Sequence, residues 1–325
     1  MTAASAPAVL LGALVVGAAL SAADLLRAQE RTLVLYTTPA LKDLLEKDVI
    51  PRYREETGQA VAPVYVAAGE QYNRLRLSGD SPEADLFLHA SPLFLEKGHH
   101  DGYFAAVRVP EAEGWNETFR GREVDGGRVW YAFAWTPLVE VYRPAFAEPP
   151  DLAASGLRFG LAHPLLSNNG VYNALYFETV DPEAGRRAVE RTTVQPTNAR
   201  SSISALADGS FDVTLGYEAV TLFYQSRGAD VRMSLPHLGG ERHVVPVLFS
   251  AGLVKDHPHD EAERFLRFLF TNETQERLPR YFFRPASGDA VPEGGVDLAQ
   301  AEAVRYDWSR WEELEASLKA YEVKT

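Results

Sequence analysis

Residues 32–45 decide the fold and read TLVLYTTPALKDLL. An apolar, β-prone run stops at two hydroxyl residues, Thr37 and Thr38, and an amphipathic helical pattern begins at Leu41 and ends before Gly58. In an open α/β sheet, such a junction places hydroxyls and free backbone N–H groups at the carboxyl end of a strand, where these sheets bind ligands. Thr37 and Thr38 are therefore candidate ligand-binding residues, although plain helix capping would also account for them.

Strand and helix patterns continue to alternate after this junction. The next expected elements are two strands, 60–66 and 84–89, and two helices, 70–77 and 91–98. This alternation is typical of a doubly wound, largely parallel sheet.

Two long β-prone runs that contain proline, 128–141 and 243–253, break the alternation. We interpret them as strands that cross between two domains. Residues 29–134 and 246–325 are then a discontinuous domain 1, and residues 135–245 are an inserted domain 2. The fold class is α/β, with two doubly wound domains joined by a two-strand hinge and a ligand cleft between them.

Domain 2 is expected to begin with a strand at 157–161, and the chain is expected to end in a helix at 299–321. Between the strand and the next helix lies a polar turn at 163–170. We see no internal repeat and no low-complexity linker.

The N-terminus carries an export signal. Residues 8–23 are almost wholly apolar and end in small residues, although no Lys or Arg precedes them. We interpret residues 1–28 as a cleaved signal peptide. An uncleaved N-terminal anchor is the alternative, because the run is close to the roughly 18 residues that span a membrane.

Composition excludes several classes of function. The chain of 325 residues has a net charge of −13 and no cysteine. Disulfides, thiolate metal sites and a cysteine nucleophile are therefore absent. The negative charge and the lack of a long basic run disfavour nucleic-acid binding.

Four segments carry a resemblance to a known family: 33–58, 81–91, 205–218 and 260–276. In this order behind an export segment, they resemble the type II periplasmic solute-binding proteins of ABC importers. The similar branch includes ferric-ion, sulfate, molybdate and tungstate binders. The resemblance implies the periplasmic-binding-protein-like II fold, a small solute or inorganic ion as ligand, a membrane permease as partner, and no catalysis or cofactor. It also implies a monomer.

Domain 1 offers two further candidate ligand residues. Gly69 follows the second strand and lets the backbone approach a ligand closely, whereas its neighbour Glu70 either argues against an oxyanion cage or points away. Ser91 follows the third strand, where capping before Pro92 explains it as well as ligand contact does.

Domain 2 offers the remaining candidates. Ser167, Asn168 and Asn169 open its first helix and resemble the polar turn that relatives point into the cleft, although a capped Asn/Gly turn is the plain alternative. Tyr217 and Glu218 come directly after a strand. Near this place in the chain, the ferric-ion binders of the similar branch carry two adjacent tyrosines. Glu218 is equally well explained as a first-turn residue stabilised by the helix dipole.

We predict no metal site. Residues 99–101 and 257–260 are rich in His and Asp but lie at expected helix ends, where exposure or capping is commoner than metal ligation. A tyrosinate pair for ferric iron is doubtful, because Tyr217 and Tyr224 are two helical turns apart, about 10 Å.

The function that these patterns favour is an extracytoplasmic protein that captures a small anionic or polar solute for an ABC importer. A ferric-ion binder of the same fold is the runner-up. A membrane-anchored ligand sensor is a third hypothesis. An exported enzyme is the least favoured, because no Gly-x-Ser-x-Gly or His-Glu-x-x-His motif and no acid–base pair stands out.

Overall fold

The computed structural model describes residues 31–79, 82–154, 156–255 and 259–323. Residues 1–28, which we interpret from the sequence as an export signal or an anchor, lie outside these described residues. Within them, no helix combines the length and the apolar character that crossing a membrane requires.

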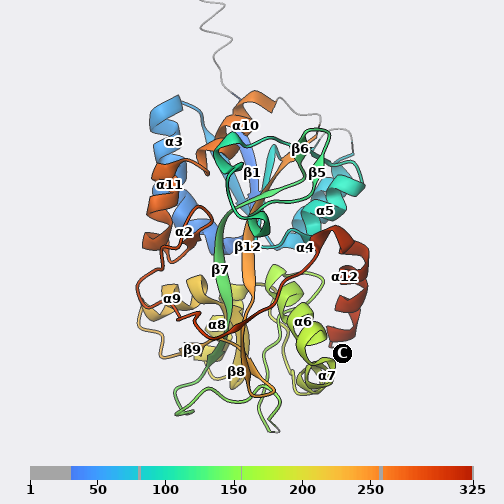
Figure 1. Cartoon of the computed structure of the whole chain (residues 1–325), viewed down its shortest axis with the longest axis vertical. Helices are drawn as coiled ribbons and strands as arrows, with labels where there is room; N and C mark the ends of the chain where they lie inside the picture. The colour runs from blue at the N-terminus through green and yellow to red at the C-terminus, as the bar shows by residue number, and fades with distance from the viewer. Residues whose placement is uncertain (1–30, 80–81, 155, 256–258, 324–325) are drawn as a thin grey trace, which may run out of the picture.

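The molecule has two α/β lobes stacked along its long axis, with the long strand β7 (Tyr131–Tyr142) running through both (Figure 1). In one half β7 pairs with β12 (Pro246–Val254) and β13 (Arg284–Pro285), and in the other half with β8 (Val213–Tyr217) and β9 (Arg232–Ser234). This arrangement confirms the α/β fold and the first predicted crossing.

The second crossing is split into two strands. β11 (Glu241–Val244) belongs to the second lobe, and β12 enters the first lobe after Val245. The break falls at Pro246, which faces Pro137 of β7 in the ladder. Because proline lacks the backbone N–H that a ladder needs, two facing prolines weaken the pairing at the junction of the lobes.

The first lobe is built on a mixed sheet in the order β13-β7-β12-β3-β1-β2, with β4 also paired to β12. Only β1, β2 and β3 pair in parallel, so the sheet is less parallel than expected. The remaining strands are β1 (Leu33–Thr37), β2 (Val61–Tyr65), β3 (Leu86–His89), β4 (Phe104–Ala105), β5 (Glu123–Val124) and β6 (Gly127–Arg128).

Helices cover both faces of this sheet (Figure 1). The expected first helix forms as one run, α2 (Lys42–Leu44), the π turn η2 (Leu45–Val49) and α3 (Ile50–Thr57), and ends at Gly58 with a φ of 79°. The other helical elements are η1 (Pro39–Leu41), α4 (Ala68–Ser78), α5 (Leu93–His100), η3 (Pro110–Ala112), η4 (Glu117–Phe119), α10 (His259–Phe268), α11 (Asn272–Arg277) and η5 (Leu278–Tyr281).

The second lobe lacks the strand predicted at 157–161. Phe159 donates to the carbonyl of Arg191 and Gly160 to that of Val213, so successive residues bond to different segments and no ladder forms. The other elements of this lobe are α6 (Asn168–Val180), α7 (Pro182–Glu190), α8 (Ala199–Ala207), α9 (Glu218–Gln225) and β10 (His237–Leu238).

The C-terminal tail differs most from expectation. The helix predicted at 299–321 is wrong over its first half, where β14 (Glu302–Ala303) instead pairs with β11 of the second lobe. The tail then forms η6 (Trp308–Arg310), α12 (Trp311–Leu318) and η7 (Lys319–Tyr321). Since α12 packs against both α5 and α6, the tail contacts both lobes, and its assignment to domain 1 stays a prediction.

Candidate functional site

Thr37 is the last residue of β1, and Thr38 follows it at the predicted junction between strand and helix. Thr37 is fully buried and lies beside Tyr65 of β2 and Leu88 of β3 in the ladder. Its Oγ1 has no hydrogen-bond partner among the described residues. Thr38 accepts a long hydrogen bond from the N–H of Ala40 at 3.5 Å and so caps η1. Capping therefore accounts for Thr38 but not for Thr37.

Gly69 lies at the N-terminal turn of α4, where the two lobes touch. Its N–H donates to the carbonyl of Leu166 in the second lobe at 3.4 Å. A Cβ at this position would lie 2.7 Å from the carbonyl oxygen of Leu165, so only glycine permits this approach. Glu70 is half exposed and forms an ion pair with Arg74, which points its carboxylate away along the helix.

Ser91 is buried, and its Oγ accepts a hydrogen bond from the N–H of Leu93 at 3.2 Å. This turn occupies the hydroxyl as an acceptor, so the structure favours the capping explanation. Its neighbour His89 is also buried, stacked on Phe87, and neither ring nitrogen has a partner among the described residues. Burial lowers the pKa of His89 to about 3, so the ring is neutral.

Ser167, Asn168 and Asn169 open α6 and are all buried. Ser167 is the N-cap and accepts from the N–H of Asn169 at 3.1 Å. The Nδ2 of Asn169 donates to the carbonyl of Leu215 at 3.0 Å, which fixes the orientation of its amide. The Oδ1 atoms of Asn168 and Asn169 are left without donors in the described part of the chain.

Tyr217 and Glu218 lie at the junction of β8 and α9 but differ in their partners. The Tyr217 hydroxyl is buried without a hydrogen bond among described residues, and burial, reinforced by Tyr172, raises its pKa. Glu218 is fully buried, and its two oxygens accept from Arg284 at 2.8 and 2.9 Å. The Val296 N–H adds a third bond at 2.7 Å. Glu218 is therefore occupied by the protein itself.

A cavity of about 200 Å³ lies between the lobes, and Ala40 and Ala219, two residues after Thr38 and Tyr217, are in its wall. None of the predicted ligand residues lines this cavity itself. Its walls come from η1, α2 and η2, from α8 and α9, and from the segment around η5. Four basic residues and one acidic residue line it: Lys47, Arg200, Arg227, Arg280 and Asp43. The cavity therefore has an excess of positive charge in a chain of net charge −13.

Arg200 is the residue that sequence reasoning missed. It lies in the first turn of α8, which Asn198 and Ser201 cap in a reciprocal capping box. The guanidinium of Arg200 lies 4.2 Å from the centre of the Phe223 ring, and its Nε is buried without a partner in the described residues. The run from Asn198 to Ser201 is a recognisable N-terminal signal, and a basic residue directly after such a cap could have been singled out.

Ion pairs also join the lobes at this cavity. Asp43 of α2 accepts from Arg200 at 3.5 Å and from Arg227 at 3.3 Å, both in the second lobe. The cations and hydrogen bonds around Asp43 outweigh its desolvation and lower its pKa. Together with the Gly69–Leu166 bond, these pairs hold the segments after β1 and β2 against the second lobe.

The two His- and Asp-rich segments that we did not predict to bind metal have partners within the protein, as far as the structure describes them. His99 lies with its Nδ1 2.9 Å from the carbonyl of Phe104, and Asp101 accepts a hydrogen bond from Tyr72. Residues 257 and 258 lie outside the described residues.

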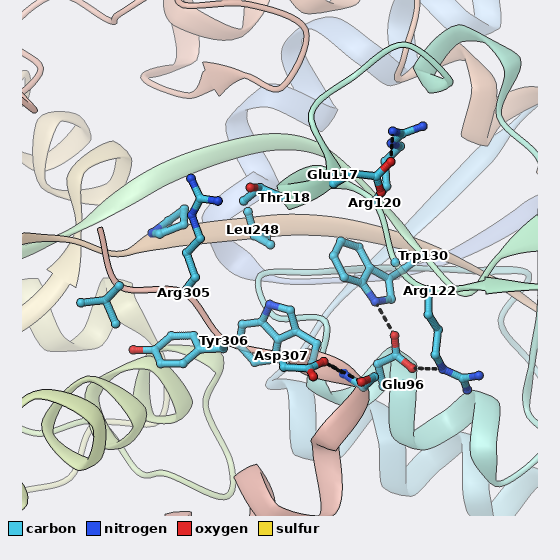
Figure 2. A pocket seen from close by; sticks show the side chains of 15 residues that line it. Glu96, Glu117, Thr118, Arg120, Arg122, Trp130, Leu248, Arg305, Tyr306 and Asp307 are labelled. Carbon is cyan, nitrogen blue, oxygen red and sulfur yellow. Dashed lines mark hydrogen bonds and ion pairs between the residues drawn. The ribbon is translucent and has the colours of Figure 1, made fainter. Parts of the chain in front are cut away.

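A second pocket, of about 220 Å³, lies between the first lobe and the tail (Figure 2). In Figure 2, Arg305 and Tyr306 of the tail lie on one side of the pocket and Trp130 and Arg122 on the other, and the Tyr306 hydroxyl points away from Trp130. Glu96 is already satisfied, because Trp130 donates to one oxygen at 2.8 Å and Arg122 to the other at 2.9 Å. None of the predicted ligand residues lines this pocket.

The two-lobed α/β fold and the polar junction between the lobes define a class of protein. Proteins of this class bind a solute between their two lobes. Residues 33–284 match the family model described as bacterial extracellular solute-binding protein. The chain belongs to this family. Its role is that of the solute-binding component of an ABC importer.

Individual relatives agree with this class. A sulfate-binding protein from Synechococcus elongatus is 26% identical over 281 residues, covering 82% of this chain and 74% of the relative. The periplasmic binding protein AfuA of Actinobacillus pleuropneumoniae, solved with fructose 6-phosphate, has a TM-score of 0.76 at 15% identity, covering 89% of this chain and 97% of AfuA. A ferric binding protein from Campylobacter jejuni has a TM-score of 0.70 at 17% identity, covering 89% of this chain and 98% of that protein.

Proposed function

We propose that this protein binds a small anionic solute between its lobes and delivers it to the permease of an ABC importer. One observation carries the proposal. Buried hydrogen-bond donors from both lobes lack partners among the described residues: Thr37 Oγ1 in the first lobe, and the Tyr217 hydroxyl and Arg200 Nε in the second. An unpaired buried donor costs about 1–3 kcal/mol, and a bound oxyanion would remove that cost.

The charge around these donors supports an anion. The cavity beside them has four basic residues against Asp43. The first turns of α6 and α8 adjoin, since the Nδ2 of Asn169 donates to the Ser202 hydroxyl at 3.5 Å, and a helix N-terminus favours negative charge. Guanidinium groups such as Arg200 match the oxygens of phosphate or sulfate better than an ammonium does.

The unpaired acceptors restrict the chemical class of the solute further. The Oδ1 of Asn169 is fixed as an acceptor, because its Nδ2 donates to a backbone carbonyl. A solute that contacts Asn169 would therefore also donate a hydrogen bond. Hydrogen phosphate or the phosphate ester of a polyol has both features, whereas sulfate has no proton to donate at neutral pH.

The ferric-ion alternative finds less support. Ferric iron needs negatively charged oxygen ligands, and both oxygens of Glu218 are bonded to Arg284. Burial raises the pKa of Tyr217, which opposes formation of a tyrosinate. Among the relatives, one is named for sulfate and one is solved with fructose 6-phosphate, whereas the Campylobacter jejuni protein is named for ferric iron.

Calorimetry on the purified protein tests the proposal. Titrations with phosphate, sulfate, a hexose 6-phosphate, ferric citrate and thiamin should give binding of an anion and no turnover. Arg200→Gln should weaken anion binding by about 10- to 100-fold, because a hydrogen bond to a charged group contributes about 1.5–3 kcal/mol.

Arg186→Gln is the matched control, since Arg186 is exposed on α7 and pairs only with Glu183 in the described structure. The control should bind as the wild type does. Binding of ferric iron without any anion, or an Arg200→Gln variant with unchanged affinity, would contradict the proposal.

Export, the form of the N-terminus and the oligomeric state belong to the same proposal. We infer that residues 1–28 direct export and that the protein acts as a monomer. N-terminal sequencing of protein from the producing cell distinguishes the two forms. A start near residue 24 supports cleavage, and a start at Met1 or Thr2 supports an anchor and the sensor hypothesis. Size-exclusion chromatography with light scattering tests the monomer.

A further inference from the structure

A cluster of potential metal ligands lies in the second lobe, apart from the solute site. Glu241, His243 and Glu302 each offer a ligand atom, and these atoms all lie within 4.8 Å of one another. Glu241 and His243 belong to β11, and Glu302 belongs to β14 of the tail. None of these residues lines the interlobe cavity.

Strand geometry brings the three side chains together. β11 and β14 pair in parallel with His243 opposite Glu302, so these two side chains lie next to each other on the same face. Glu241 is two residues before His243 and shares that face of the strand. The cluster therefore offers one imidazole nitrogen and two carboxylates.

His243 is held in place by its other contacts. The residue is 3% exposed, and its ring packs edge-on against Tyr176 of α6 at 5.6 Å. Its Nδ1 lies 3.1 Å from the Tyr176 hydroxyl, which leaves Nε2 for a further partner. Metal-binding histidines almost always hold their second nitrogen in such a hydrogen bond, because it fixes the ring and its tautomer.

The two carboxylates are accessible and unpaired. Glu241 and Glu302 are exposed, and neither carboxylate forms a hydrogen bond or an ion pair within the described residues. Both line a hollow of about 570 Å³ together with Gly240, Arg242, Ala299 and Gln300, which opens the two carboxylates to solvent. Two carboxylates next to a buried imidazole thus lie open to solvent, and neither is ion-paired within the described residues.

We propose that Glu241, His243 and Glu302 bind a zinc ion. Zinc takes nitrogen and carboxylate ligands at about 2.0–2.2 Å in tetrahedral geometry, and three protein ligands plus a water complete such a site. The exposed glutamates supply the small movements that close the distances, while His243 stays fixed. Magnesium and calcium prefer shells made of oxygen alone and fit a histidine less well.

The ion would tie the tail to the second lobe. β14 has two residues, a very short pairing, and the chain beyond it leads to α12, which packs against both lobes. A zinc ion shared by β11 and β14 would fasten this crossing segment. Zinc should therefore raise the melting temperature and slow proteolysis of the tail, independently of any solute.

The test uses the full chain after treatment with a chelator. Titration with zinc against a chromophoric indicator should give one site per chain, and cobalt should give the visible absorption of a four-coordinate site. Glu302→Gln and Glu241→Gln should each weaken zinc binding at least tenfold and abolish the rise in melting temperature. Both residues are exposed, so these variants should fold.

Glu312→Gln is the matched control, because Glu312 is an exposed glutamate of α12 outside the cluster. It should bind zinc as the wild type does, and His243→Gln should bind none. Absence of zinc binding at micromolar concentration would overturn the proposal. Binding that persists unchanged in Glu302→Gln would overturn it too, since the ion would then lie elsewhere.

Discussion

Glu218 and Arg284 form a buried ion pair where α9 meets the first lobe. Both side chains are almost fully buried, and the guanidinium also lies 5.4 Å from the ring of Trp135. Glu218 follows β8 in the second lobe, whereas Arg284 belongs to β13, so the pair joins the lobes at the crossing strand. A charge buried in this way is stable only while its partner is present.

Glu218→Gln should therefore destabilise the fold by about 3–5 kcal/mol, because Arg284 would remain buried without a counter-ion. Urea unfolding measures the loss. The folded variant should bind the anion with unchanged affinity at low temperature. A variant that unfolds like the wild type but no longer binds solute would instead make Glu218 a ligand residue.

Glu140 of β7 makes stability depend on pH. It is fully buried, its Oε2 accepts from the N–H of His237 at 3.2 Å, and its Oε1 has no partner among the described residues. Burial raises the pKa of Glu140 to about 8. The native state thus holds a proton that the unfolded chain releases near pH 4.5, so stability falls as the pH rises from about 4.5 to 8.

Glu140→Gln should remove this dependence. Between pH 5 and 8.5, the unfolding free energy of the wild type should fall relative to the variant by on the order of 3 kcal/mol. Urea unfolding at the two pH values measures the difference. Glu276→Gln, an exposed glutamate on α11, should follow the wild type. Parallel curves for Glu140→Gln and the wild type would show that Glu140 titrates normally.

At the scale of elements, the start of α4 controls how closely the lobes approach. The N–H of Gly69 reaches Leu166, and the carbonyl of Leu165 lies where a Cβ would be. The loop that contains residues 165 and 166 directly precedes α6, which carries the asparagines of the proposed site. The contact at Gly69 therefore limits how closely the start of α6 can approach the first lobe.

Gly69→Ala should lower anion affinity by about tenfold or more, because relieving this overlap costs about 1–3 kcal/mol in the closed arrangement. Alanine favours a helix over glycine, so the melting temperature without solute should not fall. Calorimetry and thermal unfolding together test this. Gly114→Ala is the control, since a Cβ there meets no atom within 4 Å. Unchanged affinity in Gly69→Ala would show that the contact is unnecessary for binding.

The sequence predicted most elements, because their signals are local. The strand-to-helix junction at Thr37, the cap at Ser167 and the crossing at residues 131–142 rest on patterns within one or two turns of chain. The predictions failed where pairing with a distant segment decided the outcome. Residues 302 and 303 form a strand because β11 is beside them, and residues 157–161 formed no strand because neighbouring residues bond to different segments.

At the scale of the molecule, Asp43 links the lobes through Arg200 and Arg227. We propose that the lobes open and close about the crossing strands near Pro137 and Pro246, with Asp43 favouring the closed form when no solute is bound. Partly exposed ion pairs contribute up to about 1 kcal/mol, which is enough to change the ratio of two forms severalfold.

Asp43→Asn should therefore increase the radius of gyration of the solute-free protein in small-angle scattering. A saturating anion should restore the compact form, because the solute itself bridges the lobes. Asp208→Asn, an exposed aspartate after α8, should scatter like the wild type. Identical scattering of Asp43→Asn and wild type, with and without anion, would argue against this role of Asp43.

The sequence by itself determined the class of fold, the first crossing strand and the junctions at Thr37 and Ser167, because hydrophobic periodicity and capping are properties of adjacent residues. Only the tertiary structure decided which polar groups remain free. Glu218 is bonded to Arg284, 66 residues away, and Arg200 reaches Asp43 across the lobes. Partners so distant along the chain leave no local pattern, so the choice between a free ligand group and an occupied one depends on the packing of the two lobes.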